Sequence, residues 1–175
     1  NQEVQGIFTP PILASTAVEE VPGVVSASRT NSIGSIVFRH EQNAFTEQEV
    51  FFADSNFYKF FGYELLKGDP NTALEGPNKA VLTESAAAKY FGDEEPLGKT
   101  LIVGNDRTSF EVSGINADPP HNSHFKFDIL LSFSSTEYSR STEWLSNSIN
   151  TYIELAPGTQ IDRVQTDLNG LIDKY

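Results

Sequence analysis

Three phrases between Ala53 and Phe133 constrain the fold of this chain more than any other feature. In chain order they read ADSNFYKFFGYELLKGDP, AVLTESAAAKYFGDEEPLGKTL and FEVSGINADPPHNSHFKFDILLS. Each phrase joins an apolar run to glycine or proline, the residues that end helices and form turns. The apolar runs require a shared core, and none of the phrases carries a constellation of catalytic side chains. The pattern therefore predicts a folding unit and not a catalytic site.

The first phrase predicts a short helix rich in phenylalanine. Asp54 is expected to cap it, and Phe57, Phe60 and Phe61 follow at spacings that place them on one face. Gly62 stands where a left-handed residue would end the helix. Isolated helices of fewer than roughly 12 residues are marginal in water, so this one must dock on a sheet.

The second phrase predicts another short helix, which Thr83 caps and Gly92 ends. Its apolar residues recur at helical spacing and are expected to form the buried face: Ala86, Ala87, Tyr90 and Phe91. This helix is also too short to be stable alone, so its aromatic face is expected to pack on the same sheet.

Length and charge limit the class of protein. The 175 residues suit one domain or two small lobes, and thirteen Phe and six Tyr supply large core side chains. The net charge is −12, from 24 acidic and 12 basic residues, and the basic residues are scattered. Because no basic cluster could neutralise phosphates, we expect no nucleic-acid partner.

Cysteine is absent, which excludes a disulfide framework, a thiolate metal site and a cysteine nucleophile. No stretch approaches the ~18 continuous apolar residues of a membrane span. The sequence starts at Asn1 without an initiator methionine or a signal peptide. We therefore expect an excised or processed fragment.

The remaining sequence predicts a mixed pattern of helices and strands. Thr9 is expected to cap a first helix that begins with Pro10 and Pro11, and a last helix is expected to present one apolar stripe: Ile161, Val164, Leu168, Leu171 and Ile172. Strands are expected at residues 24–28, 33–39, 49–53, 79–83, 125–131 and 149–155, with a hairpin inside 99–114 and a polar turn at Asn31. Since strands and helices do not alternate regularly, the predicted fold class is α+β.

Two groups of polar residues resemble sites. Asp118, His121 and His124 have a spacing that could serve a metal, but Pro119 and Pro120 between them favour a rigid turn. The carboxylates at 93–95 follow a helix end, and adjacent carboxylates on a turn are normally solvated and not an acid–base pair. We therefore predict no metal site and no catalytic residue.

Other candidate sites are weaker. There is no Gly-x-Ser-x-Gly elbow, Ser113 lies in an expected strand, and no glycine-rich nucleotide motif is present, so no cofactor is predicted. The phenylalanines are better explained as core than as a ligand groove. Trp144 lies in a Ser- and Thr-rich stretch at 134–147, expected to be a loop with a helical turn near the tryptophan, and either role stays open for it.

In this order, the three phrases resemble the extracytoplasmic (periplasmic core) domain of MacB-like and FtsX-like ABC transporter permeases. The stretches that carry the resemblance are residues 54–61, 66–70, 81–92, 96–99, 110–114 and 118–128, with support from 152–158 and the helix that follows. The resemblance implies one extracytoplasmic domain over residues 1–175. It further implies a mixed sheet with flanking helices in two lobes, one formed by residues 1–53 plus 124–175 and one inserted at 54–123.

The resemblance also implies a function. Such a domain lies between two membrane helices of a permease in the cell membrane, on the periplasmic side, and is not an enzyme. It would relay ATP-driven movement (mechanotransmission) from an ABC ATPase subunit or domain, with a second permease copy and a periplasmic adaptor or cargo as further partners. The two chain ends are then expected to lie together, each on a helix. The alternatives are a free-standing secreted or lipid-anchored module that binds a ligand near Trp144, or an enzyme in which His121 or His124 joins converging carboxylates.

Overall fold

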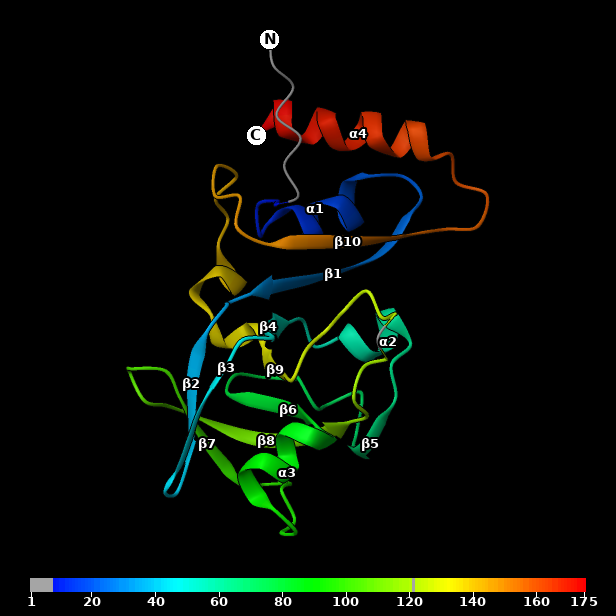
Figure 1. Cartoon of the computed structure of the whole chain (residues 1–175). Helices are drawn as coiled ribbons and strands as arrows, with labels where there is room; N and C mark the ends of the chain where they lie inside the picture. Colours follow the sequence, from blue (N-terminus) through cyan, green and yellow to red (C-terminus); the bar gives the residue numbers. More distant parts are fainter. Residues whose placement is uncertain (1–7, 121) are drawn as a thin grey trace.

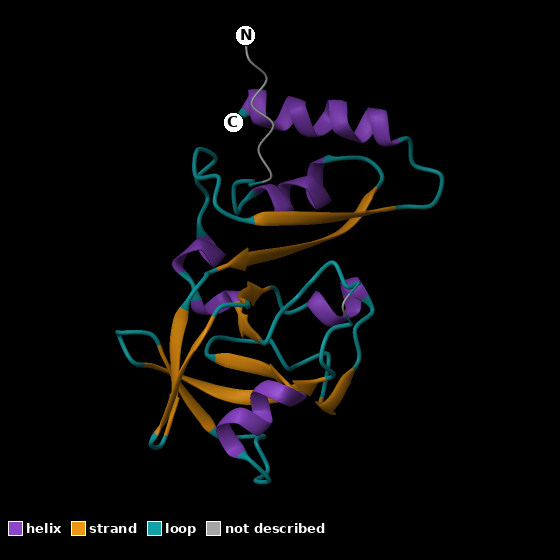
Figure 2. Ribbon diagram, in the orientation of Figure 1, coloured by secondary structure: helices purple, strands orange, loops and turns teal. Residues whose placement is uncertain are grey.

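The computed structural model describes residues 8–120 and 122–175, which form a mixed β-sheet with helices packed against it (Figures 1 and 2). The helices are α1 (Leu13–Glu20), α2 (Phe57–Phe61), α3 (Glu84–Phe91) and α4 (Ile161–Lys174), with two 3₁₀ helices, η1 (Phe133–Ser135) and η2 (Glu137–Arg140). The strands are β1 (Val24–Ser32), β2 (Ile36–His40), β3 (Asn43–Glu47), β4 (Val50–Ala53), β5 (Leu65–Gly68), β6 (Lys79–Thr83), β7 (Thr100–Val103), β8 (Thr108–Asn116), β9 (Ile129–Ser132) and β10 (Asn150–Leu155). The predicted α+β class with a mixed sheet and flanking helices is confirmed.

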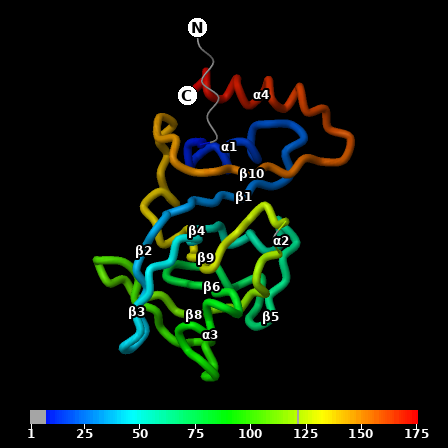
Figure 3. The backbone as a smooth tube through the Cα atoms, viewed as in Figure 1, coloured from blue at the N-terminus to red at the C-terminus, as the bar shows by residue number. Residues whose placement is uncertain are grey.

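The strands follow the order β10-β1-β4-β9-β6-β8-β7-β2-β3, and β5 pairs with β8 beside this path. The pairs β4–β9 and β6–β8 are parallel, and the other pairs are antiparallel. Figure 3 shows β10, β1, α1 and α4 gathered at one end, and β2, β3, β7 and α3 towards the other. We call the first group the helical end.

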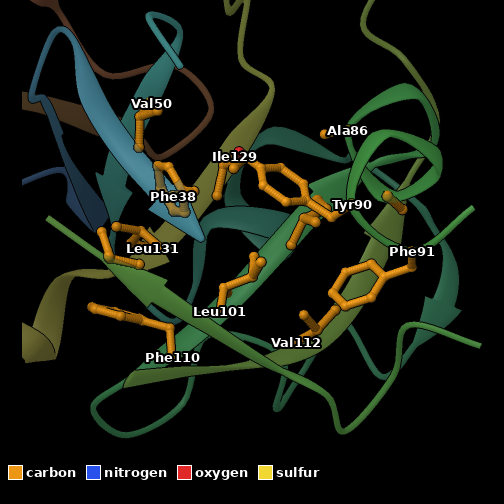
Figure 4. Close-up of a cluster of buried hydrophobic side chains, with 14 of the residues drawn as sticks. Phe38, Val50, Ala86, Tyr90, Phe91, Leu101, Phe110, Val112, Ile129 and Leu131 are labelled. Atoms are coloured by element: carbon orange, nitrogen blue, oxygen red, sulfur yellow. The ribbon is translucent and has the colours of Figure 1, made fainter. Parts of the chain in front are cut away.

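Three hydrophobic clusters stabilise the sheet. The first lies between α3 and the strands beneath it, where Phe38, Leu101 and Tyr90 converge (Figure 4). The second is aromatic and surrounds Phe57. The third joins α1 and α4 to β1 and β10 at the helical end. Burial of apolar surface, at roughly 25 cal/mol per Å², is the main stabilising contribution of each cluster.

Both short helices form where the sequence predicts them. Thr83 caps α3, because its Oγ1 accepts a hydrogen bond of 3.2 Å from the backbone N of Ala86. The buried residues of α3 are the four predicted ones: Ala86, Ala87, Tyr90 and Phe91. Helix α2 ends at Gly62, whose φ of 70° is in the left-handed region that glycine adopts without a Cβ clash.

The capping residues predicted for α2 and for α1 are wrong. The residue before α2 is Asn56, which makes no capping hydrogen bond, and the carboxylate of Asp54 binds Arg29 instead. Helix α1 starts after Ile12, while Thr9 forms a bridge to Ile149 in the sheet. In each case the residue that local spacing assigns to a helix cap bonds instead to a partner far away in the sequence.

Several strand predictions also needed correction. Asn31 lies inside β1, so the turn comes later, at residues 33–35. Strands β3 and β5 were not predicted. In the strand predicted at 125–131, Phe125 and Phe127 are buried and alternate with exposed or half-buried neighbours, as expected. The hydrogen-bonded strand β9 starts only at Ile129, however, and all four of its residues are buried. Central strands that are covered on both faces carry no alternation that a sequence pattern could reveal.

Tyr58 and Tyr90 provide a contrasting pair of stability predictions. Burial raises the pKa of both phenols, and the hydrogen bond to Glu47 raises the pKa of Tyr90 further. The Tyr58 hydroxyl has no hydrogen-bond partner among the described residues, whereas the Tyr90 hydroxyl donates to Glu47 Oε1 at 2.5 Å. Tyr58→Phe is therefore expected to keep or raise the free energy of unfolding at pH 7, by up to about 1 kcal/mol, while Tyr90→Phe lowers it by about 1–2 kcal/mol.

The same tyrosines predict a loss of stability in alkali. When the pKa of a tyrosine is higher in the folded state, its neutral phenol contributes fully to the free energy of unfolding below the unfolded-state pKa of about 10. This contribution is lost as the pH rises above that value. Urea denaturation between pH 8 and 11 should show this decline, and it should be shallower in Tyr58→Phe. An identical slope in wild type and variant would contradict the assignment.

Candidate functional site

The two outer helices meet at the helical end of the sheet. Leu13 and Ala17 of α1 pack with Val164 and Leu171 of α4 in one buried cluster. At the ends of the same helices, Glu20 accepts hydrogen bonds from Lys174 Nζ at 2.6 Å and from the Tyr175 hydroxyl at 2.7 Å. The bond from Lys174, and then that from Tyr175, lowers the pKa of Glu20. The first described helix and the last helix are therefore fastened together. The expectation that the two chain ends lie together stays a prediction, because residues 1–7 lie outside the described residues.

Helix α4 buries less of its apolar stripe than predicted. Val164 and Leu171 are buried, but Ile161 is 70% exposed and Ile172 is 60% exposed. The spacing of the five residues is helical, but the stripe is wider than the surface of α1 and β10 beneath it. Helix α4 thus has one docked side and one exposed side.

Trp144 packs at the same end. Its ring stacks on Tyr175 with centroids 4.8 Å apart and an angle of 6° between the planes, and it lies against the third cluster. The helical turn predicted near Trp144 is displaced to η2, and Trp144 itself lies in a bend. The tryptophan is therefore a packing residue that holds the loop at 141–148 against α4.

The single tryptophan makes this packing measurable. Tyr175→Ala should expose the Trp144 ring, shift its fluorescence emission to longer wavelength and increase quenching by acrylamide. The expected loss of unfolding free energy is about 1 kcal/mol, in the range of an aromatic pair. Tyr138→Ala, at a tyrosine that is 46% exposed, is the matched control and should change neither property. Unchanged emission in Tyr175→Ala would contradict the stacking.

Arg29 connects the helical end to the rest of the fold. Its Nε donates to Asp54 Oδ2 and its Nη2 to Asp54 Oδ1, both at 2.9 Å, in a two-pronged ion pair. The backbone of Arg29 also takes part, because Arg29 N donates to the carboxylate atom Asp54 Oδ2 at 2.8 Å and Asp54 N donates to Arg29 O at 3.1 Å. Both side chains are only 19% exposed. Such paired, charge-assisted bonds fix orientation as well as distance.

The same guanidinium reaches three further segments. Its Nη1 donates to Pro11 O at 3.2 Å, just before α1, and to Ser139 O at 3.5 Å in η2. Its Cζ lies 4.5 Å from the centre of the Phe133 ring, a cation–π distance. A shallow hollow of about 510 Å³ lies beside it, lined by residues of α1, β1 and the segment before α2. Arg29 thus links α1, β1, both 3₁₀ helices and the segment that leads into α2, and we call this set of contacts the Arg29 junction.

Asp118 and His124, the two described residues of the possible metal or turn motif, bond to different partners. His124 Nε2 lies 3.0 Å from the Tyr152 hydroxyl, and Asp118 accepts hydrogen bonds from the Ser85 side chain at 2.5 Å and backbone at 3.1 Å. His121 lies outside the described residues. Within residues 8–120 and 122–175, no group of three His, Asp or Glu side chains is arranged to hold a metal ion.

The carboxylates at 93–95 lie on the surface. Glu94 pairs with Lys99, and Glu95 accepts a bond of 2.7 Å from Lys67 Nζ. The hydrogen bond from its lysine is the largest cause that lowers the pKa of each glutamate. These groups act as ion-pair partners, and their lowered pKa values make them poor proton donors near neutral pH.

A second group of carboxylates lies near the proline turn. Glu49, Asp118 and Asp128 line a hollow of about 250 Å³. Burial, and then the charge of Glu47, raises the pKa of Asp128. His124 is not in the lining of this hollow, so the described residues do not bring a histidine and these carboxylates into one pocket.

No described helix has the length and hydropathy needed to cross a membrane.

Sequence reasoning missed the Arg29 junction. Two signals pointed towards it: an arginine in the middle of a strand, and an aspartate directly after the apolar strand β4. Either could have been read as a buried charge in need of a partner. The identity of that partner depends on the pairing of β1 with β4, which the sequence does not display.

Comparisons with known proteins agree with this fold. The model of the MacB-like periplasmic core domain family matches residues 3–171. A domain assigned to a permease protein from Porphyromonas gingivalis is 28% identical, with a TM-score of 0.83 over 97% of this chain and 78% of that chain. None of the curated proteins compared with the chain matched it.

Two more distant structures share the fold. The periplasmic region of MacB from Actinobacillus actinomycetemcomitans is 20% identical, with a TM-score of 0.70 over 98% of this chain and 75% of that chain. The extracellular domain of the noncanonic ABC-type transporter YknZ from Gram-positive bacteria is 18% identical, with a TM-score of 0.68 over 95% of this chain and 83% of that chain. Since the family model spans nearly all of the sequence and the three phrases that suggested the family lie inside the match, the chain belongs to the family of MacB-like periplasmic core domains, found in ABC transporter permeases.

Proposed function

We propose that this domain is a non-catalytic relay, which passes ATP-driven movement from permease membrane helices to a substrate or partner outside the membrane. The single observation that carries the proposal is the arrangement of the helical end: α1 and α4 are fastened by Glu20, Lys174 and Tyr175, and the Arg29 junction ties α1 to the sheet. Membership of a family of permease periplasmic domains supplies the general kind of function.

The relay requires stiffness between the place where force enters and the place where it is used. Force on α1 or α4 would act on β1 and β10 through the third cluster, because packed apolar layers deform little. From β1 it would pass through Arg29 and Asp54 to the segment leading into α2, and through the sheet to α3. Movement of such packed elements as rigid bodies is a common form of switching.

The proposal assigns partners and organisation. One extracytoplasmic domain over residues 1–175 would hold a terminal lobe, 1–53 plus 124–175, and an inserted lobe, 54–123. An ABC ATPase subunit or domain would drive it through the membrane helices, beside a second permease copy, with a periplasmic adaptor or cargo outside. The rival function, a free-standing ligand-binding module, has lost its main candidate contact, since Trp144 is stacked on Tyr175.

Labelling in whole cells tests the location. The chain has no cysteine, so Gln165→Cys on the exposed surface of α4 creates one unique thiol in this domain. In cells that express the parent protein, a membrane-impermeant maleimide should label it without lysis, and the coding sequence should hold an apolar span of at least about 18 residues on each side of the domain. Labelling only after lysis, or flanks without spans, would favour the rival function or a different cellular location.

A further inference from the structure

An unusual concentration of positive charge lies on the surface over β2 and β7. Arg39, His40, Lys99 and Arg107 line one shallow hollow of about 450 Å³, together with Glu41 and with Gly98, Thr100 and Ile102. The sequence places Arg39 far from Lys99 and Arg107, and our expectation of scattered basic residues does not hold at this position. Figure 1 shows β2 and β7 away from α1 and α4, so the hollow is not part of the helical end.

Among the described residues, the two arginines in this hollow have no carboxylate partner, although the chain has 24 acidic and only 12 basic residues. Seven of the twelve Lys and Arg side chains form ion pairs within the described structure. Lys99 is one of them and is paired with Glu94. Neither Arg39 nor Arg107 forms an ion pair with any described residue, including Glu41 in the same lining. Two guanidinium groups without an ion-pair partner among the described residues therefore line one hollow in a strongly acidic protein.

The two arginines differ in how the backbone constrains them. Arg39 Nη1 donates to Gly104 O at 3.0 Å, which fixes this guanidinium against the β7–β8 loop that carries Arg107. Arg107 has a φ of +58°, in the left-handed region where a residue with a Cβ is disfavoured and glycine is preferred. Backbone outliers of this kind concentrate at functional sites, and the φ of Arg107 therefore supports a binding role for its side chain without establishing one.

We propose that this hollow binds carboxylates from an acidic segment of a partner protein. A guanidinium presents two parallel N–H donors that match the two oxygens of a carboxylate, and Arg39 leaves donors free beyond the one that binds Gly104. Phosphate fits less well. None of the lining residues belongs to a helix N-terminus, the common backbone site for phosphate. The inference does not depend on the proposed relay.

The test uses the 175-residue domain and a synthetic hexapeptide of four glutamates and two glycines. In ¹⁵N NMR titrations at low salt, the shift changes should be confined to residues 39–41 and 98–107. Arg107→Gly should weaken binding at least about tenfold, the loss expected for a charge-assisted bond, while its melting temperature stays equal or rises because the strained φ is relieved. Arg39→Gln should show a similar loss of affinity.

Arg140→Ala is the matched control. Arg140 is exposed, forms no ion pair within the described structure and lies in η2, away from the hollow, so its removal changes net charge equally. Its affinity for the peptide should stay within about twofold of wild type, consistent with weak long-range effects. An equal loss in Arg140→Ala, shifts spread over the whole surface, or binding of inorganic phosphate without binding of the peptide would each overturn the proposal.

Discussion

Replacing Phe57 by alanine is expected to lower the free energy of unfolding by about 3–5 kcal/mol, the range for a buried phenylalanine. The side chain is 0% exposed at the centre of the second cluster. Ring centroids between 4.9 and 6.1 Å away belong to Tyr58, Phe61, Tyr63, Phe125 and Phe127. The contacts come from segments before and after the turn at Pro119 and Pro120. Because these segments are held by different strands, we expect them not to move together and fill the cavity that the variant leaves. Urea denaturation followed by circular dichroism at pH 7 measures the loss.

Phe60→Ala in the same helix is the matched control. Phe60 is half-buried, and its one described ring contact is with Phe61, at 4.8 Å. We expect a loss of about 1 kcal/mol or less, in line with its smaller buried area. Equal losses for the two variants would show that the aromatic cluster is not organised around Phe57.

Arg29→Ala and Asp54→Ala should each lower the free energy of unfolding by about 2–4 kcal/mol. Each change leaves a charge that is only 19% exposed without its partner, and a poorly solvated lone charge is the main cost of breaking such a pair. The double variant should lose little more than either single variant. The resulting coupling energy, about 1.5–3 kcal/mol, can be measured by a double-mutant cycle in urea.

The exposed pair between Lys67 and Glu95 supplies the comparison. Its nitrogen and oxygen are 2.7 Å apart, but the side chains are 49% and 59% exposed. Its coupling energy should be no more than about 1 kcal/mol and should fall with added salt. If Arg29 and Asp54 show a coupling as small as this one, the Arg29 junction does not stiffen the fold.

The sequence predicted those elements whose signals are local. Helix α3 has a capping threonine at one end, glycine at the other and an apolar face between them, and all of these lie within ten residues of Thr83. The β7–β8 hairpin and α4 also carry their turn or periodicity within one segment. The family resemblance rested on such local phrases, and for that reason it could be recognised before the sheet order was known.

Features that depend on sheet order could not be predicted. The carboxylate of Asp54 looks like a helix cap until β1 and β4 are paired, which brings Arg29 beside it. Arg39 and Gly104 are 65 positions apart and meet only because β2 pairs with β7. The exposed Ile161 and Ile172 have the same helical spacing as their buried neighbours, and periodicity alone does not show how much of a stripe the sheet covers.

The central claim is that movement enters at the helical end and reaches the far end of the sheet. It is tested most directly by the distance between spin labels on Gln42→Cys, at an exposed position in the β2–β3 turn, in the two permease copies of the proposed dimer, because a rigid domain that moves changes its distance from its neighbour and not its internal distances. The measurement uses the parent permease, reconstituted with its ATPase, in the ADP state and in a trapped ATP state. We predict that the mean distance changes by at least about 2 Å between the two states, the scale of helix shifts in known switches, and that Asp54→Ala reduces this change. The same distance distribution in both nucleotide states would contradict the relay.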